Sequence, residues 1–387
     1  MQTIKKINTI IYTLTCLFFS YPAAYADNAN WMSQIPNDRI FNQLIIPGTH
    51  NSATASIQPQ SPFSLSGDDP LPAWIEEISN ILPISIVRPI VAGWSKTQPY
   101  SIKKQLNNGI RYLDFRVCYF QSHLYTCHAL ISNRLKKSLH QLQTFIHNNP
   151  SEIVIVDINH IYNVNSSDTE TQLIQLLQNS LGDIAIPNTH QLSETIGSLR
   201  ASKRNVIILM NLTQPINDPT AAEFAKHDIF AESNINSPWP NVTTVNDLKN
   251  KLDPEVAFRA SSVSSSTSLF VLQMIQTESA TQIIDGVLNP AQYPNRIQPY
   301  EAPVNALLST WLNNYIASDG ANALNIVIQD WFTKDSPIVP LAIQYDSQAI
   351  SPSLKNNSAL HEKLLALQAW YKHVQKKGYY FISTKVA

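Results

Sequence analysis

The first residue that could do chemistry is His50, which follows the short apolar and turn segment 45–49. An apolar run that stops at Pro-Gly predicts a buried strand with His50 at its carboxyl end, and we expect Gly48 to adopt a backbone conformation that other residues resist. In a parallel barrel the carboxyl ends of the strands converge on one mouth and carry the chemistry. An imidazole there could exchange a proton near neutral pH. The alternative is a buried histidine that is hydrogen-bonded within a turn.

A second group with chemical potential lies in segment 111–119, which reads as a strand. Alternation along this strand places four side chains on one face: Tyr112, Asp114, Arg116 and Cys118. Parallel strands are covered on both sides, so this charged face is expected to point into a cavity. A return strand over 124–128 would bring His128 beside Asp114 and Arg116. The alternative is a buried ion pair of Asp114 and Arg116 without a catalytic role.

Composition limits the classes of function. The chain has 387 residues, of which 44% are hydrophobic and only 14% are charged, and its net charge is −1. This length and apolar content allow one large α/β domain with additions. No basic field exists to attract nucleic acid, so we expect no nucleic-acid partner. Glycine is scarce, at 9 residues against 24 prolines, and neither common phosphate-loop motif occurs.

Residues 1–26 read as a cleaved signal peptide, with early lysines, an apolar core and a small-x-small site at 24–26. We therefore expect a secreted or periplasmic protein without a transmembrane span in the mature chain. An uncleaved anchor is the alternative, but the apolar run is shorter than the ~20 residues that span a bilayer. Removal of Cys16 with the signal would leave Cys118 and Cys127, which we predict to pair in an oxidising compartment.

The middle of the chain repeats a strand-then-helix rhythm typical of an α/β barrel. The expected helices are 135–147, 169–181 and 304–318, and the expected strands are 153–160, 205–212, 269–273 and 325–330. Between the first two strands lies a long excursion, 52–98, whose second half is apolar and includes an expected helix at 73–82. It could be a helical pair packed outside the barrel, or a lid or membrane-contacting flap.

Several segments occur in an order that is familiar from one family. They are 47–52, 94–98, 105–106, 111–116, His128, 152–162, 238–241, 270–273 and 325–330. This series resembles the phosphatidylinositol-specific phospholipase C X-domain family, especially its small X-domain-only members of the bacterial, metal-independent type. The resemblance covers roughly residues 31–343. It implies a distorted TIM-type barrel, which we place over 27–345, with the apolar excursion as an insertion after the first strand. Beyond residue 343 the resemblance fades, but an amphipathic pattern over 358–377 and the segment 379–382 predict a helix and strand extension over 346–387, packed on the barrel. A membrane-surface role for this helix is the alternative.

The resemblance also implies a reaction, the cleavage of phosphatidylinositol to diacylglycerol and a cyclic inositol phosphate. His50 matches the general base that takes the proton of the inositol 2-hydroxyl, and Asp330 matches the carboxylate that orients this base. His128 matches the general acid for the leaving diacylglycerol oxygen, and Asp114 is expected to hold it protonated. Arg116 matches the arginine that takes the place of calcium and stabilises charge on the phosphate.

Two positions depart from the pattern of the metal-independent branch. Asn51 stands where its members carry aspartate, as in the calcium-dependent branch, but Asn159 stands where that branch carries a glutamate ligand. Because Arg116 occupies the position of the metal, we expect no metal and no other cofactor, and calcium is disfavoured. We expect Asn51, Asn159 and Gln273 to contact the substrate, a phospholipid at a membrane surface, and we expect a monomer.

Two other functions remain open at this level. A related barrel phosphodiesterase could act on glycerophosphodiesters or on other phospholipids such as sphingomyelin, but those relatives hold a metal with Glu and Asp pairs that segment 114–116 does not supply. An inactive barrel could bind inositol lipids or a partner protein. The presence of His50 and His128 together with Asp330 favours an enzyme.

Overall fold

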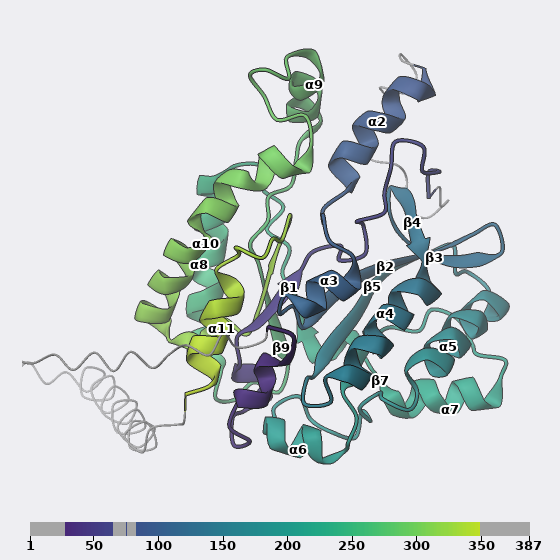
Figure 1. Ribbon diagram of the computed structural model, residues 1–387, viewed down its shortest axis with the longest axis vertical. Coiled ribbons are helices and arrows are strands. Elements are labelled where there is room, and N and C mark those ends of the chain that lie inside the picture. The colour runs from purple at the N-terminus through teal and green to yellow at the C-terminus, as the bar shows by residue number, and fades with distance from the viewer. Residues whose placement is uncertain (1–27, 65–74, 76–82, 349–387) are drawn as a thin grey trace, which may run out of the picture.

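A computed structural model describes residues 28–64, 75 and 83–348 of the chain (Figure 1). The expected signal peptide, most of the expected helix at 73–82 and the expected extension beyond residue 348 lie outside the described residues. Within the described part, no helix is long and apolar enough to cross a membrane.

The centre of the fold is a curled sheet of parallel strands in the order β7-β6-β5-β2-β1-β10-β9-β8. Their bounds are β1 (Ile46–Thr49), β2 (Tyr112–Phe120), β5 (Val154–Tyr162), β6 (Val206–Met210), β7 (Ile229–Phe230), β8 (Ile235–Asn236), β9 (Leu269–Gln273) and β10 (Ile326–Gln329). No pairing joins β7 to β8 among the described residues, and the short turn η3 (Glu232–Asn234) links them instead. The expected α/β class is confirmed, as a curled parallel half-barrel.

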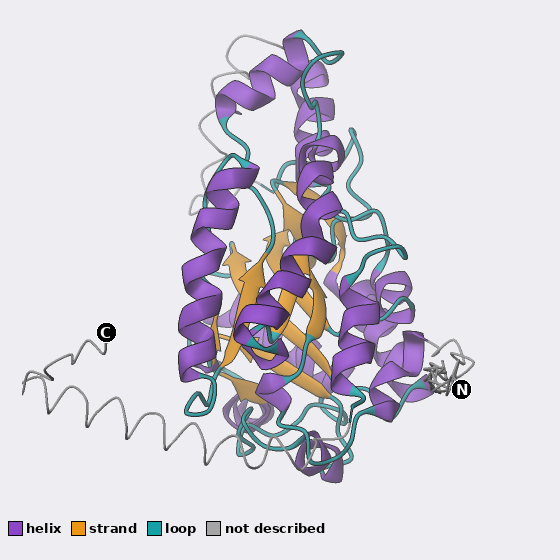
Figure 2. Cartoon of the chain, turned by 90° about the vertical axis from the view of Figure 1, so that its left-hand side faces the viewer, coloured by secondary structure: helices purple, strands orange, loops and turns teal. Residues whose placement is uncertain are grey.

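Helices cover the outside of this sheet (Figure 2). They are α2 (Ile84–Ser95), α3 (Ile102–Asn107), α4 (Leu135–Asn148), α5 (Ser167–Leu181), α6 (Ile196–Ala201), α7 (Pro219–Asp228), α8 (Val245–Ser262), α9 (Ala280–Leu288), α10 (Ile297–Asp319) and α11 (Ile338–Asp346). An antiparallel hairpin, β3 (His123–His128) and β4 (Leu130–Arg134), continues from β2. Helices α2 and α9 project past one end of the strands (Figure 1).

The two faces of β2 belong to different cores, as alternation predicts. Leu113, Phe115 and Val117 pack in the core that α4 and α5 share with the outer face of the sheet. Tyr112 lies in the inner core, where the short helix η1 (Asn28–Gln34) contributes Trp31 and Met32. Residues 28–34 therefore pack in the same core as Tyr112, while the charged side chains of β2 are left for the cavity.

Three local predictions need correction. The first strand includes the Pro-Gly pair instead of stopping at it. Gly48 does not have a positive φ; a Cβ atom there would lie 2.8 Å from Tyr112 Cδ1 and 2.8 Å from Ile328 Cγ2, so glycine is required for space. Helix α10 begins at Ile297, before the predicted start at 304, and contains Pro303 within it.

Candidate active site

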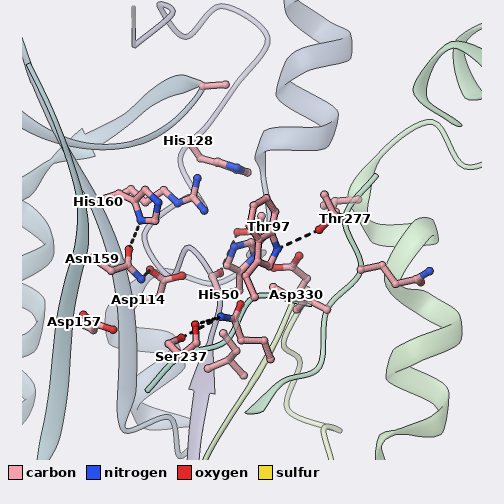
Figure 3. A pocket seen from close by; sticks show the side chains of 18 of the residues that line it. His50, Thr97, Asp114, His128, Asp157, Asn159, His160, Ser237, Thr277 and Asp330 are labelled. Carbon is pink, nitrogen blue, oxygen red and sulfur yellow. Dashed lines mark hydrogen bonds and ion pairs between the residues drawn. The ribbon is translucent and has the colours of Figure 1, made fainter. Parts of the chain in front are cut away.

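A cavity of about 880 Å³ opens at the carboxyl ends of the parallel strands (Figure 3). The structure brings most of the predicted site residues together in its wall: His50, Asp114, Arg116, His128, Asn159, Gln273 and Asp330. Asn51 is buried behind this wall and reaches it through its side-chain amide. Segments that are far apart in the sequence thus converge on one mouth, as the barrel geometry requires.

His50 and Asp330 are neighbours because of strand register. Thr49 of β1 pairs with Gln329 of β10, so the next residue of each strand faces the other. His50 Nδ1 lies 2.9 Å from Asp330 Oδ1, and His50 Nε2 lies 2.9 Å from Asn51 Nδ2. With Nδ1 donating to the carboxylate and Nε2 accepting from the amide, the imidazole is neutral. Burial is the main cause that lowers the pKa of His50 to about 4, so Nε2 is free of a proton at neutral pH.

Gln98 holds these two strand ends together, a role that the sequence analysis missed. Its Nε2 donates to the carbonyl oxygens of His50 at 2.9 Å and Gln329 at 3.0 Å, and its Oε1 accepts from Phe332 N at 3.1 Å. The side chain is fully buried. Segment 94–98 therefore positions His50 through its backbone carbonyl.

Asp114 does not contact His128, contrary to the expectation from the sequence. Its Oδ2 accepts from Asn51 N at 2.8 Å and its Oδ1 accepts from Asn159 Nδ2 at 2.9 Å. These bonds fix the backbone that follows His50 and orient the Asn159 amide. The carboxylate is thus a positioning group between β1, β2 and β5, and the partner of His128 must be sought elsewhere.

That partner is a backbone carbonyl. His128 Nδ1 lies 2.9 Å from Ser95 O at the end of α2, and the rings of His128 and His50 are 6.2 Å apart between centroids. The predicted disulfide is present, joining Cys118 of β2 to Cys127 of β3 directly before His128. Burial, followed by the charge of Arg116, lowers the pKa of His128 well below its usual range.

Arg116 reaches the cavity without a charged partner. No ion pair or hydrogen bond joins its guanidinium to any residue that the structure describes, and its buried Nε has no hydrogen-bond partner. The alternative of a buried Asp114–Arg116 ion pair is therefore not what the fold forms. A partly buried cation whose buried Nε has no partner favours an anionic ligand, because ionic groups removed from water require compensation.

Several groups in the cavity were not singled out from the sequence. Tyr112 Oη donates to Asp157 Oδ2 at 2.6 Å, and burial raises the pKa of Asp157 to about 7. Glu278 also lines the cavity, and burial raises its pKa to about 7. His160 lies 2.8 Å from Asn159 Oδ1 through its Nδ1. The available signal was Asp157 itself, a single acid inside the otherwise apolar strand segment 153–158.

The chain is similar in sequence to proteins of known families. The PI-PLC X family model matches residues 90–212. Human PI-PLC X domain-containing protein 2 is 26% identical over 276 residues, which cover 70% of this chain and 85% of that protein. The variant-surface-glycoprotein phospholipase C of Trypanosoma brucei brucei is 28% identical over 235 residues, covering 58% of this chain and 62% of that protein.

Solved structures give the same answer for the fold. The phosphatidylinositol-specific phospholipase C of Listeria monocytogenes superposes with a TM-score of 0.53 at 18% identity, covering 84% of this chain and 100% of that one. The corresponding Staphylococcus aureus enzyme gives 0.54 at 12% identity, covering 84% and 98%.

The chain is a relative of the PI-PLC X domain proteins. The matched PI-PLC X region contains Asp114, Arg116 and His128. His50 and Asp330 lie outside it, on β1 and β10, and the fold brings them to the same cavity. The PI-PLC X region of this chain is therefore completed by strands from both ends of the barrel.

Proposed function

We propose that this protein is a phosphodiesterase that cleaves phosphatidylinositol into diacylglycerol and a cyclic inositol phosphate. The observation that carries the proposal is the arrangement of His50, His128 and Arg116. An unprotonated imidazole nitrogen, backed by Asp330, lies across the cavity from a second imidazole, and an unpaired guanidinium shares the space. The names of the trypanosomal and bacterial relatives agree with this chemistry.

In the proposed reaction, His50 Nε2 accepts the proton of the inositol 2-hydroxyl as that oxygen attacks phosphorus. Before the substrate binds, Asn51 Nδ2 donates a hydrogen bond to His50 Nε2. The inositol 2-hydroxyl then replaces this amide as the donor to Nε2. His128 donates a proton to the diacylglycerol oxygen as its bond to phosphorus breaks, and Arg116 stabilises the charge on the non-bridging oxygens. One proton is taken and one is given, so the step leaves the total charge of the complex unchanged, and His50 then releases its proton to solvent.

The lowered pKa of His128 makes its protonation depend on the substrate. Arg116 is the second cause of this shift, after burial. A phosphodiester beside Arg116 carries a negative charge that offsets the guanidinium and favours the imidazolium. We therefore propose that His128 takes up its proton together with the substrate, and that Asp114 contributes through the backbone of Asn51 instead of through His128.

Apolar side chains around the mouth are consistent with a substrate in a lipid surface. Glu278 and Ile297, which flank α9 in the chain, and Trp94 at the end of α2 all line the cavity. The exposed large apolar residues of these regions and of the loop after β8 are Ile84, Ile86, Trp239, Ile284, Leu288 and Tyr293. Exposed apolar groups of this size are typical of interaction surfaces; here Trp239 lines the cavity, and α2 and α9 project past one end of the strands (Figure 1).

We also propose that the reaction needs no metal and that the protein is exported as a monomer. The described part of the chain contains no group of three or more His, Cys, Asp or Glu side chains suited to a metal ion. Arg116 brings a fixed positive charge into the same cavity, which disfavours a divalent cation. The Cys118–Cys127 disulfide is consistent with an oxidising compartment.

The decisive experiment incubates the mature protein with phosphatidylinositol vesicles, with and without EDTA, and follows diacylglycerol and inositol phosphate. Turnover that survives EDTA supports the proposal. Turnover that requires added calcium would overturn the metal-free site, and cleavage of phosphatidylcholine, sphingomyelin or glycerophosphodiesters in place of phosphatidylinositol would overturn the substrate. Vesicle binding without any turnover would favour the inactive, lipid-binding barrel.

A further inference from the structure

The cavity wall contains a buried polar pair, Tyr112 and Asp157, which the reaction above does not use. Both residues line the cavity and are 1% exposed. Tyr112 Oη donates to Asp157 Oδ2 at 2.6 Å, but Asp157 Oδ1 has no hydrogen-bond partner. Buried polar atoms are nearly always paired, and an unpaired carboxylate oxygen is costly. The fold thus holds an acceptor in the cavity wall for which the chain supplies no donor.

The orientation of this acceptor is fixed by its surroundings. Asp157 of β5 pairs in register with Asp114 of β2, and Tyr112 lies two residues before Asp114 on the same face. The Tyr112 ring fills the space that a side chain at Gly48 would need, since a Cβ atom there would lie 2.8 Å from Cδ1. Because Tyr112 holds Oδ2, Asp157 cannot turn its free oxygen away without losing that bond. Figure 3 places Asp157 below Asp114, on the same side of the cavity.

The charges around the cavity divide it into two ends. Arg116 supplies the cationic end, beside His128, where an anion would bind. Asp157 lies with Glu232 at the other end, and no described cation forms an ion pair with Asp157. Burial raises the pKa of Asp157 to about 7, as expected for a carboxyl group that no positive charge compensates. An anionic group is disfavoured at this end, and a neutral hydrogen-bond donor is favoured.

We propose that Asp157 reads a hydroxyl group of the substrate's headgroup ring, with Oδ1 accepting the hydrogen bond and Tyr112 positioning the carboxyl group. This inference rests on the proposed function, because the phosphate at Arg116 sets which part of the headgroup reaches Asp157. It makes Asp157 a specificity residue for polyol headgroups. A choline headgroup, whose ammonium is fully methylated, has no O–H or N–H donor to offer there and leaves Oδ1 unpaired.

The test compares Asp157→Asn and Tyr112→Phe with a matched pair outside the cavity. Tyr315 Oη donates to Asp253 Oδ1 at 2.8 Å on the outer helices, so Asp253→Asn and Tyr315→Phe remove the same kind of bond elsewhere. In Asp157→Asn, the amide oxygen accepts from Tyr112 and the NH₂ group, a donor, replaces the free acceptor. The probes are myo-inositol, followed by calorimetry or ligand-observed NMR, and phosphatidylinositol vesicles, followed by turnover.

We expect Asp157→Asn to weaken myo-inositol binding and kcat/KM for phosphatidylinositol about 10- to 100-fold. Tyr112→Phe should cause a smaller loss, mainly in KM, and both outer variants should match the wild type. Wild-type affinity in Asp157→Asn, or no binding of myo-inositol by the wild type, would each overturn the proposal. Failure of the proposed function looks different, because the wild type would then not cleave phosphatidylinositol while Asp157→Asn still weakened myo-inositol binding.

Discussion

Replacing Asp157 with asparagine should stabilise the folded protein, and increasingly so as the pH rises. Burial raises the pKa of Asp157 from 3.8 to about 7 in the folded state. Between these two values the folded protein binds more protons at this site than the unfolded chain does, so the free energy of unfolding of the wild type falls as the pH increases. Asparagine does not titrate and escapes this loss, and its amide oxygen can still accept the bond from Tyr112.

The size of the effect follows from the shift. A shift of about three units corresponds to about 4 kcal/mol, at about 1.4 kcal/mol per unit. The side chain is 1% exposed, so solvent screening does not reduce the shift appreciably. Most of the change falls between the two pKa values, and about 2 to 3 kcal/mol of it lies between pH 5 and pH 8.

The assay is urea unfolding of the wild type and Asp157→Asn at pH 5, 6, 7 and 8. The difference in unfolding free energy, variant minus wild type, should grow by about 2 to 3 kcal/mol across this series. Using the difference cancels the contributions of the other buried carboxyl groups. A difference that is constant with pH, or one that shrinks as the pH rises, would refute the argument that Asp157 is a carboxyl group buried at a cost to stability.

The remaining predictions concern turnover. His50→Ala and His128→Ala should each abolish cleavage of phosphatidylinositol while the protein stays folded, and more than a few per cent of residual activity would contradict their roles. Arg116→Lys keeps the charge but loses the planar fork that spans two phosphate oxygens, so kcat should fall about 100-fold or more in the same assay. Reduction, or Cys127→Ser, should lower turnover more than Tm, because the short loop contributes only roughly 2 to 3 kcal/mol while a shift of about 1 Å at His128 can cost about a hundredfold. Two alkylatable thiols in the denatured, unreduced mature protein would contradict this last prediction.

Most of the correct predictions from the sequence came from the periodicity of apolar and polar residues along the strands. The alternation in 111–119 placed Asp114 and Arg116 on the cavity face, and the apolar runs that end in polar residues identified β1 and β10 as the strands that deliver His50 and Asp330. These predictions depend only on burial patterns that repeat along one strand. The meeting of β1 with β10 then follows from parallel barrel topology, which the resemblance to PI-PLC X proteins supplied.

Side-chain partners were not predictable in the same way. His128 was assigned to Asp114 because both lie near the same end of neighbouring strands, but Ser95 O takes its Nδ1. That carbonyl belongs to the end of α2, inside the long insertion between β1 and β2. The insertion has no regular alternation of apolar and polar residues from which its path could be predicted. Gln98, which joins the ends of β1 and β10 through two carbonyls, comes from the same insertion. Contacts that depend on how an irregular segment folds back are set by tertiary packing.

The pKa values of His50 and His128 are both lowered, so both imidazoles are uncharged at neutral pH when no substrate is bound. Burial is the main cause for each, and Arg116 adds to it in both cases. A base needs such a shift, since it keeps His50 Nε2 free of a proton, but an acid needs the reverse. The two roles become compatible only when an anion beside Arg116 removes part of the field that acts on His128. In the proposed reaction, the unpaired guanidinium therefore does more than bind phosphate: it lets the charge of the substrate raise the pKa of His128, whose ring lies 6.2 Å from that of His50 between centroids.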